Sequence, residues 1–169
     1  YTRHGTVCVT ANWHVTAGQI LAPTISETRD NQDFAEHIRQ TIATDPTAGW
    51  VFIVDNLNTH CGEPLVRLVA EQLATDPESL GAVRKSGVLE SMVTRRAFLS
   101  DPSHRIRLVY LPKHSSWLNQ IEIVFGIINR RVMRRGNFTS QLDLIGKLKR
   151  FIDYFNATFA KPMNWTYTG

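Results

Sequence analysis

The residues best suited to chemistry begin where an apolar run meets a carboxylate. Residues 51–54 are all apolar and lead directly into Asp55, and Asn56, Asn58 and His60 follow within five positions. In an open α/β sheet, reactive groups gather where buried strands end at their carboxyl side. A carboxylate there is a suitable ligand for a hard divalent cation. The alternative is that Asp55 only forms the turn after a strand.

A second carboxylate, Glu122, stands in an apolar segment with helical spacing. Ile121, Val124 and Phe125 are predicted to face a core, and Glu122 lies on the neighbouring face in the first turns of the helix. A glutamate there also interacts favourably with the helix dipole, by up to about 1 kcal/mol. The dipole does not explain why residues 112–117 are rich in side chains that suit phosphate contacts.

The hydrophobic pattern predicts the elements that must position these carboxylates. In chain order they are strands 6–13 and 19–25, helix 31–43, strand 50–54, helix 61–73, strand 105–110, and helices 117–135 and 139–159. The continuously apolar run 50–54 predicts a central strand buried on both faces. The polar segment 75–104 is interpreted as an insertion with a short helix at 89–99. This order predicts an α/β fold with a mixed sheet flanked by helices.

The bulk properties fit one domain over residues 1–169. The composition is 43% hydrophobic and 20% charged, as in an average globular protein. There is no run of 18 apolar residues and no secretory signal pattern, so we expect no membrane span. Cys8 and Cys61 are isolated cysteines, which favours a reduced, cytoplasmic protein.

The charge is distributed unevenly along the chain. Residues 1–104 hold 8 Lys/Arg and 12 Asp/Glu, whereas residues 105–169 hold 11 Lys/Arg and 3 Asp/Glu. A net charge of +8 in the C-terminal part favours a polyanionic partner such as nucleic acid. A solvated basic helix is the alternative.

Four segments resemble a known family. They are VDNLNTH, LPKHSSWLNQIEIVFGIINRR, RGNFTS and FIDYFNATFAKPMNWTYTG. They look like the catalytic domain of bacterial mariner-type insertion-sequence transposases, and the resemblance covers nearly all of the chain. These are DDE enzymes, named for two Asp and one Glu, and they have a ribonuclease H-like fold.

The resemblance implies that Asp55 is the second catalytic Asp and Glu122 the final Glu. Both would be ligands of divalent metal, with two Mg²⁺ or Mn²⁺ ions in the complete site. It implies DNA strand cleavage and strand transfer at transposon ends, with transposon and target DNA as partners. A homodimer in the active complex and a bacterial, nucleoid-associated location in the cytoplasm are further expectations.

Other polar residues receive supporting roles. We expect Asn56, Asn58, His60 and Asn119 to support the metal ligands or contact substrate. The expected DNA contacts are Lys113, His114, Ser115, Trp117, Arg130, Arg131, Arg134 and Arg135. For the arginines the alternative is a favourable interaction with the helix C-terminus. For Trp117 the alternative is burial at the start of the helix.

Two features depart from the family pattern. The first catalytic Asp belongs to a central strand upstream of Tyr1, and Asp30 and Asp33 are poor substitutes because they precede or open a helix. We therefore expect a chain truncated before the first Asp, with unpaired strand edges and no catalysis on its own. Asp55 and Glu122 are also 67 positions apart, a wide spacing that the 75–104 insertion explains.

Two other functions stay open at this point. One is a metal-dependent nuclease or resolvase of the same fold. The other is a domesticated DNA-binding module without catalysis.

Overall fold

The computed structural model describes residues 6–113, 115 and 118–162. The chain divides into two compact units, which are residues 1–27 with 120–169 (unit 1) and residues 28–119 (unit 2). Whether both form one domain, as the chain length suggests, stays a prediction.

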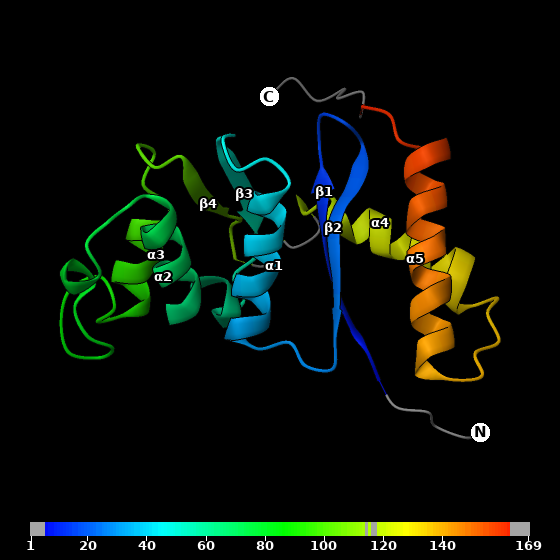
Figure 1. Cartoon of the computed structure of the whole chain (residues 1–169), viewed down its shortest axis with the longest axis horizontal. Coiled ribbons are helices and arrows are strands. Elements are labelled where there is room, and N and C mark those ends of the chain that lie inside the picture. Colours follow the sequence, from blue (N-terminus) through cyan, green and yellow to red (C-terminus); the bar gives the residue numbers. More distant parts are fainter. Residues whose placement is uncertain (1–5, 114, 116–117, 163–169) are drawn as a thin grey trace. The chain divides into compact units, whose positions relative to one another are not determined.

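Unit 2 is built on two parallel strands, β3 (Trp50–Val54) and β4 (Ile106–Tyr110) (Figure 1). They pair in register from Trp50 opposite Ile106 to Val54 opposite Tyr110. The helices are α1 (Asn31–Ala43), α2 (Glu63–Gln72) and α3 (Met92–Leu99), with short 3-10 turns at Asn58–Cys61 and Pro77–Leu80. The two strands therefore end side by side at their carboxyl ends.

Helix α1 begins at a capping box that uses two aspartates. The Asp30 carboxylate accepts the N–H groups of Gln32 and Asp33, and the Asp33 carboxylate accepts the N–H of Asp30 and the hydroxyl of Thr28. These bonds satisfy N–H groups that an α-helix leaves without partners. Both carboxylates are thus occupied in starting a helix, which supports the interpretation that neither replaces a catalytic Asp.

Strand β3 is buried on one face only, which corrects the expectation of burial on both faces. Phe52 and Val54 pack into the core with α1 and α2, whereas Val51 and Ile53 are 53% and 52% exposed. Val109 of β4 is exposed as well. The physical reason is that the helices of unit 2 pack against a single face of the strand pair.

The predicted insertion is part of the core of unit 2. Leu80, Leu89 and Leu99 are fully buried in the same cluster as Leu65 and Leu108. Its helix, α3, is shorter than the predicted 89–99 and begins at Met92, where Ser91 and Thr94 form a capping box.

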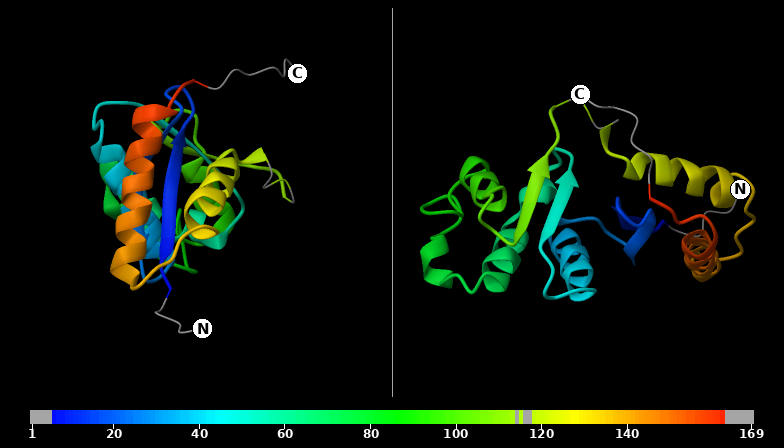
Figure 2. Two further views of the ribbon diagram at one scale, coloured as in Figure 1. Left: turned by 90° about the vertical axis from the view of Figure 1, so that its right-hand side faces the viewer. Right: turned by 90° about the horizontal axis from the view of Figure 1, so that it is seen from above.

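Unit 1 is built on an antiparallel hairpin of β1 (Cys8–His14) and β2 (Gln19–Ser26). Helices α4 (Ile121–Ile128) and α5 (Gln141–Thr158) contribute to one core with this hairpin (Figure 2). Asn156 of α5 fixes the helix to β2, because its side-chain amide makes two 2.9 Å hydrogen bonds with the backbone N–H and C=O of Ile20.

The α/β fold class is confirmed, with small sheets flanked by helices. In the described residues, however, the strands form two separate two-stranded sheets rather than one mixed sheet. The predicted helix 117–135 is also corrected, because α4 ends at Ile128 and continues as a π-helical turn, η4 (Asn129–Met133). There the N–H of Arg134 reaches the carbonyl of Asn129, five residues back.

Candidate active site

Asp55 lies at the carboxyl end of β3, beside the end of β4. Its side chain is 32% exposed. Its Oδ1 accepts the backbone N–H of Leu57 at 3.0 Å, so Asp55 does form a turn as the simpler interpretation requires. The turn uses only Oδ1, and within the described residues Oδ2 accepts no hydrogen bond.

His60 holds the same carboxylate oxygen from the other side. Its Nδ1 lies 2.9 Å from Asp55 Oδ1 and 3.3 Å from the Asp55 carbonyl. Both neighbours are acceptors, so Nδ1 carries the proton. Burial lowers the pKa of His60 more than the Asp55 carboxylate raises it, and Arg96 lowers it further. A neutral imidazole therefore donates to Oδ1 and leaves Oδ2 without a hydrogen bond among the described residues.

Asn56 joins the two strand ends. Its Nδ2 donates to the carbonyl of Leu111, just after β4. Its Oδ1 accepts from Nη1 of Arg96 at 2.8 Å. With both ends of its amide used, Asn56 fixes the backbone next to Asp55 rather than pointing to a ligand.

Arg96 and Tyr110 complete this cluster, and the sequence interpretation missed both. The Arg96 guanidinium lies 4.7 Å from the centre of the Tyr110 ring and bonds Asn56. The Tyr110 hydroxyl donates to the carbonyl of His60 at 2.7 Å, and burial is the main cause that raises its pKa. Arg96 comes from α3, so the segment 75–104 supports the loop that carries Asp55. Nothing in the sequence distinguishes Arg96 from its neighbour Arg95.

Glu122 is the second residue of α4, in unit 1, and its side chain is exposed. Within the described residues its carboxylate makes no hydrogen bond or ion pair. In the same described ranges, no cluster of three or more His, Cys, Asp or Glu side chains could hold a metal ion. Glu122 and Asp55 each offer free carboxylate oxygen, the ligand type that Mg²⁺ prefers.

Comparison with known protein families identifies the family of the chain. The family model described as DDE superfamily endonuclease matches residues 1–145. The chain belongs to the DDE superfamily endonuclease family. No curated protein and no solved structure matches it. As a DDE endonuclease it belongs among enzymes that cut DNA and typically use divalent metal ions.

The remaining predicted residues of this DDE endonuclease fall into four groups. Arg130 and Arg131 lie in η4, Arg134 and Arg135 directly follow it, and all four are exposed. Lys113 is exposed, and the N–H of Ser115 bonds the Pro112 carbonyl. His114 and Trp117 lie outside the described residues. Asn58 begins the 3-10 turn after Asp55, Asn119 is the last residue of unit 2, and their expected roles stay predictions.

The described helices of this DDE endonuclease include none that is long and apolar enough to cross a membrane.

His37 makes the stability of unit 2 dependent on pH. The side chain is 1% exposed on α1, and burial, assisted by His60, lowers its pKa from 6.5 to about 4. Above pH 6.5 the residue is neutral in both the folded and unfolded chain. As the pH falls from 6.5 towards 4 the unfolded chain takes up the proton first, so the free energy of unfolding falls.

We expect this histidine to cost on the order of 3 kcal/mol of stability at pH 4. Urea denaturation between pH 7.5 and 4.5 measures the loss, and His37→Leu should make the curve flatter. An unchanged slope in His37→Leu would show that other groups cause the acid sensitivity.

Proposed function

We propose that this chain forms part of the catalytic domain of a bacterial mariner-type transposase. Such an enzyme would cut DNA at transposon ends and join those ends to target DNA. The observation that carries the proposal is the state of the Asp55 carboxylate. One oxygen is held by Leu57 and His60, and the other is free at the carboxyl ends of β3 and β4.

Asp55 and Glu122 would hold Mg²⁺ or Mn²⁺, with two ions in the complete site. When bound, such ions activate the attacking oxygen and stabilise the leaving oxygen of a phosphodiester. The residues around Asp55 set its orientation. His60 keeps Oδ1 occupied, and the Arg96–Asn56 pair keeps the loop from moving away from the strand ends.

A third carboxylate would complete the site, and we place it on a strand that is not among the described elements. Two features support this. Within the described residues each sheet has only two strands, so the outer edge of each strand is unpaired. The apolar side chains Val51, Ile53 and Val109 are exposed on the uncovered face of β3 and β4. The 169 residues alone are therefore expected to lack cleavage activity.

The exposed arginines in η4 and directly after it (Arg130, Arg131, Arg134 and Arg135) would contact DNA phosphates. Joining two transposon ends requires that both be held together, which favours a homodimer in the active complex. The DNA substrate would place the protein at the bacterial nucleoid.

A cleavage and joining assay tests the proposal. The chain extended upstream by its own coding sequence is incubated with labelled transposon-end DNA and target plasmid, with Mg²⁺ or with EDTA. We expect both cut and joined products, and only with Mg²⁺. The family description itself favours a second candidate, an endonuclease without joining. Cutting without joining would establish that candidate, and binding without cutting would show a non-catalytic module.

A further inference from the structure

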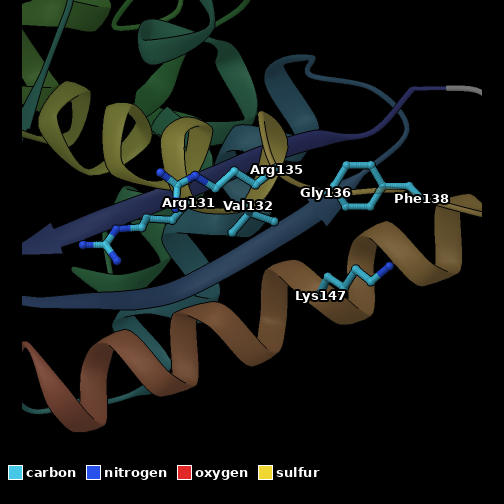
Figure 3. A pocket seen from close by; sticks show the side chains of 6 residues that line it. All are labelled: Arg131, Val132, Arg135, Gly136, Phe138 and Lys147. Atoms are coloured by element: carbon cyan, nitrogen blue, oxygen red, sulfur yellow. The ribbon is translucent and has the colours of Figure 1, made fainter.

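A small basic pocket lies in unit 1 between η4 and α5 (Figure 3). Its volume is about 230 Å³, and its lining residues are Arg131, Val132, Arg135, Gly136, Phe138 and Lys147. Figure 3 shows both arginine side chains extending from the helical segment in the direction away from Phe138 and Lys147. Lys147 extends from α5, and the Phe138 ring lies near Gly136.

The charge in this pocket is only partly neutralised. Lys147 Nζ lies 2.7 Å from Asp143 Oδ2 and 2.7 Å from the Asn137 carbonyl, so its position is fixed and its charge is balanced. Arg131 and Arg135 are exposed, and neither makes an ion pair or hydrogen bond with any residue that the structure describes. Two guanidinium groups are therefore available to an anion.

The shape of the pocket depends on Gly136. A Cβ atom at this position would collide with the Phe138 ring and with the Val132 carbonyl. Glycine therefore lets the ring lie against the end of the helical segment, where it forms an apolar wall. Lys147 Nζ lies 5.4 Å from the centre of the ring, a cation–π distance that helps to hold the ring in place.

We propose that this pocket and its two arginines bind a short stretch of a single DNA strand. Arg131 and Arg135 would bind phosphates of the strand, because the guanidinium fork matches phosphate geometry. A base further along the strand would lie against Phe138, and an aromatic wall is accessible to an unpaired base but not to one stacked within a duplex. The proposal rests on DNA as the substrate and adds a strand-holding site to it.

The position of the pocket gives this site a role. Arg131 follows Glu122 by nine residues along α4 and η4, or roughly 13 Å at a helical rise of 1.5 Å per residue. A strand held at the pocket and running along this helical segment would therefore pass Glu122 within a few nucleotides.

Fluorescence anisotropy with a labelled 16-nucleotide single strand tests the site in the 169-residue chain. We expect the double variant Arg131→Gln/Arg135→Gln to weaken binding at least tenfold in about 100 mM salt. It should also make the slope of the logarithm of the binding constant against the logarithm of the salt concentration shallower by about 1 to 2. The matched control is Lys149→Gln/Arg150→Gln, which removes two exposed charges from α5 outside the pocket. It should change affinity less than threefold.

Phe138→Leu tests the contribution of the base contact to binding separately from that of the arginine charges. It should weaken binding of the single strand at least fivefold and binding of the corresponding duplex less than twofold. Circular dichroism melting identifies any variant that has lost its fold. If a variant has, Lys147→Gln, which retains both arginines, is measured as a second probe of the same pocket.

Three results would overturn the proposal. They are equal weakening by the pocket and control variants, no effect of Phe138→Leu on the single strand, and tighter binding of an RNA strand of the same sequence. The binding assay does not depend on cleavage. DNA binding at the pocket without cut or joined products from the extended chain would refute the proposed function and leave this site intact.

Discussion

Asp55→Asn is expected to abolish Mg²⁺-dependent DNA cleavage by the chain extended upstream. The variant keeps the size and shape of the side chain and retains an Oδ1 acceptor for the Leu57 N–H and for His60 Nδ1. It removes the negative charge and replaces the free Oδ2 with an amide that cannot ligate a metal ion. Metal-ion catalysis contributes several kcal/mol, so the cleavage rate should fall at least about 10³-fold.

Asp45→Asn provides a matched control for this variant. Asp45 also forms a turn through Oδ1, with the N–H groups of Thr47 and Ala48, but it precedes β3 instead of following it. The Asp45→Asn variant should cleave DNA at close to the wild-type rate. Thermal melting should show both variants folded. Cleavage by Asp55→Asn within tenfold of the wild-type rate would reduce Asp55 to a turn residue.

Arg96→Ala is expected to destabilise unit 2 and to impair cleavage together. The variant removes the bond to Asn56 Oδ1 and the contact with the Tyr110 ring. A hydrogen bond from a charged donor contributes about 1.5–3 kcal/mol, and a cation–π contact adds about 0.5–2 kcal/mol. We therefore expect a loss of about 2–5 kcal/mol in the free energy of unfolding, measured by urea denaturation.

Two further variants show whether Arg96 acts through its specific contacts with Asn56 and Tyr110. Arg96→Lys keeps the charge but lacks the guanidinium fork, and should fall between wild type and Arg96→Ala in both stability and cleavage. Arg95→Ala removes a neighbouring arginine whose Nε bonds the Ser91 carbonyl within its own helix. It should cost less than about 1 kcal/mol and leave cleavage unchanged. Equal losses from Arg95→Ala and Arg96→Ala would exclude a specific role for Arg96.

The sequence predicted those parts of the fold that depend on local signals. Helix α1 has the predicted bounds because Asp30 and Asp33 cap it and its apolar residues repeat with helical spacing. Local signals also predicted the hairpin turn at Gly18 and the end of β3 just before Asp55. The outward position of Glu122 follows from the period of α4 alone.

Features that depend on distant partners were not predictable in this way. The apolar run of β3 indicates which side chains favour burial, but it does not say which elements cover them, and Val51 and Ile53 are exposed. Arg96 bonds Asn56 from 40 positions away. Such a contact is set by how α3 packs in the core, which no spacing pattern in the sequence records.

Mn²⁺ binding to the extended chain tests most directly the proposal that Asp55 and Glu122 are both metal ligands. Electron paramagnetic resonance counts bound Mn²⁺ in the wild type, in Asp55→Asn, in Glu122→Gln and in the double variant. Glu63→Gln is the control, because Glu63 is also a carboxylate in the first turn of a helix and shares any dipole effect. We predict that each single variant weakens binding at least tenfold, that the double variant adds little, and that Glu63→Gln binds normally. Wild-type Mn²⁺ binding by Glu122→Gln would contradict the account.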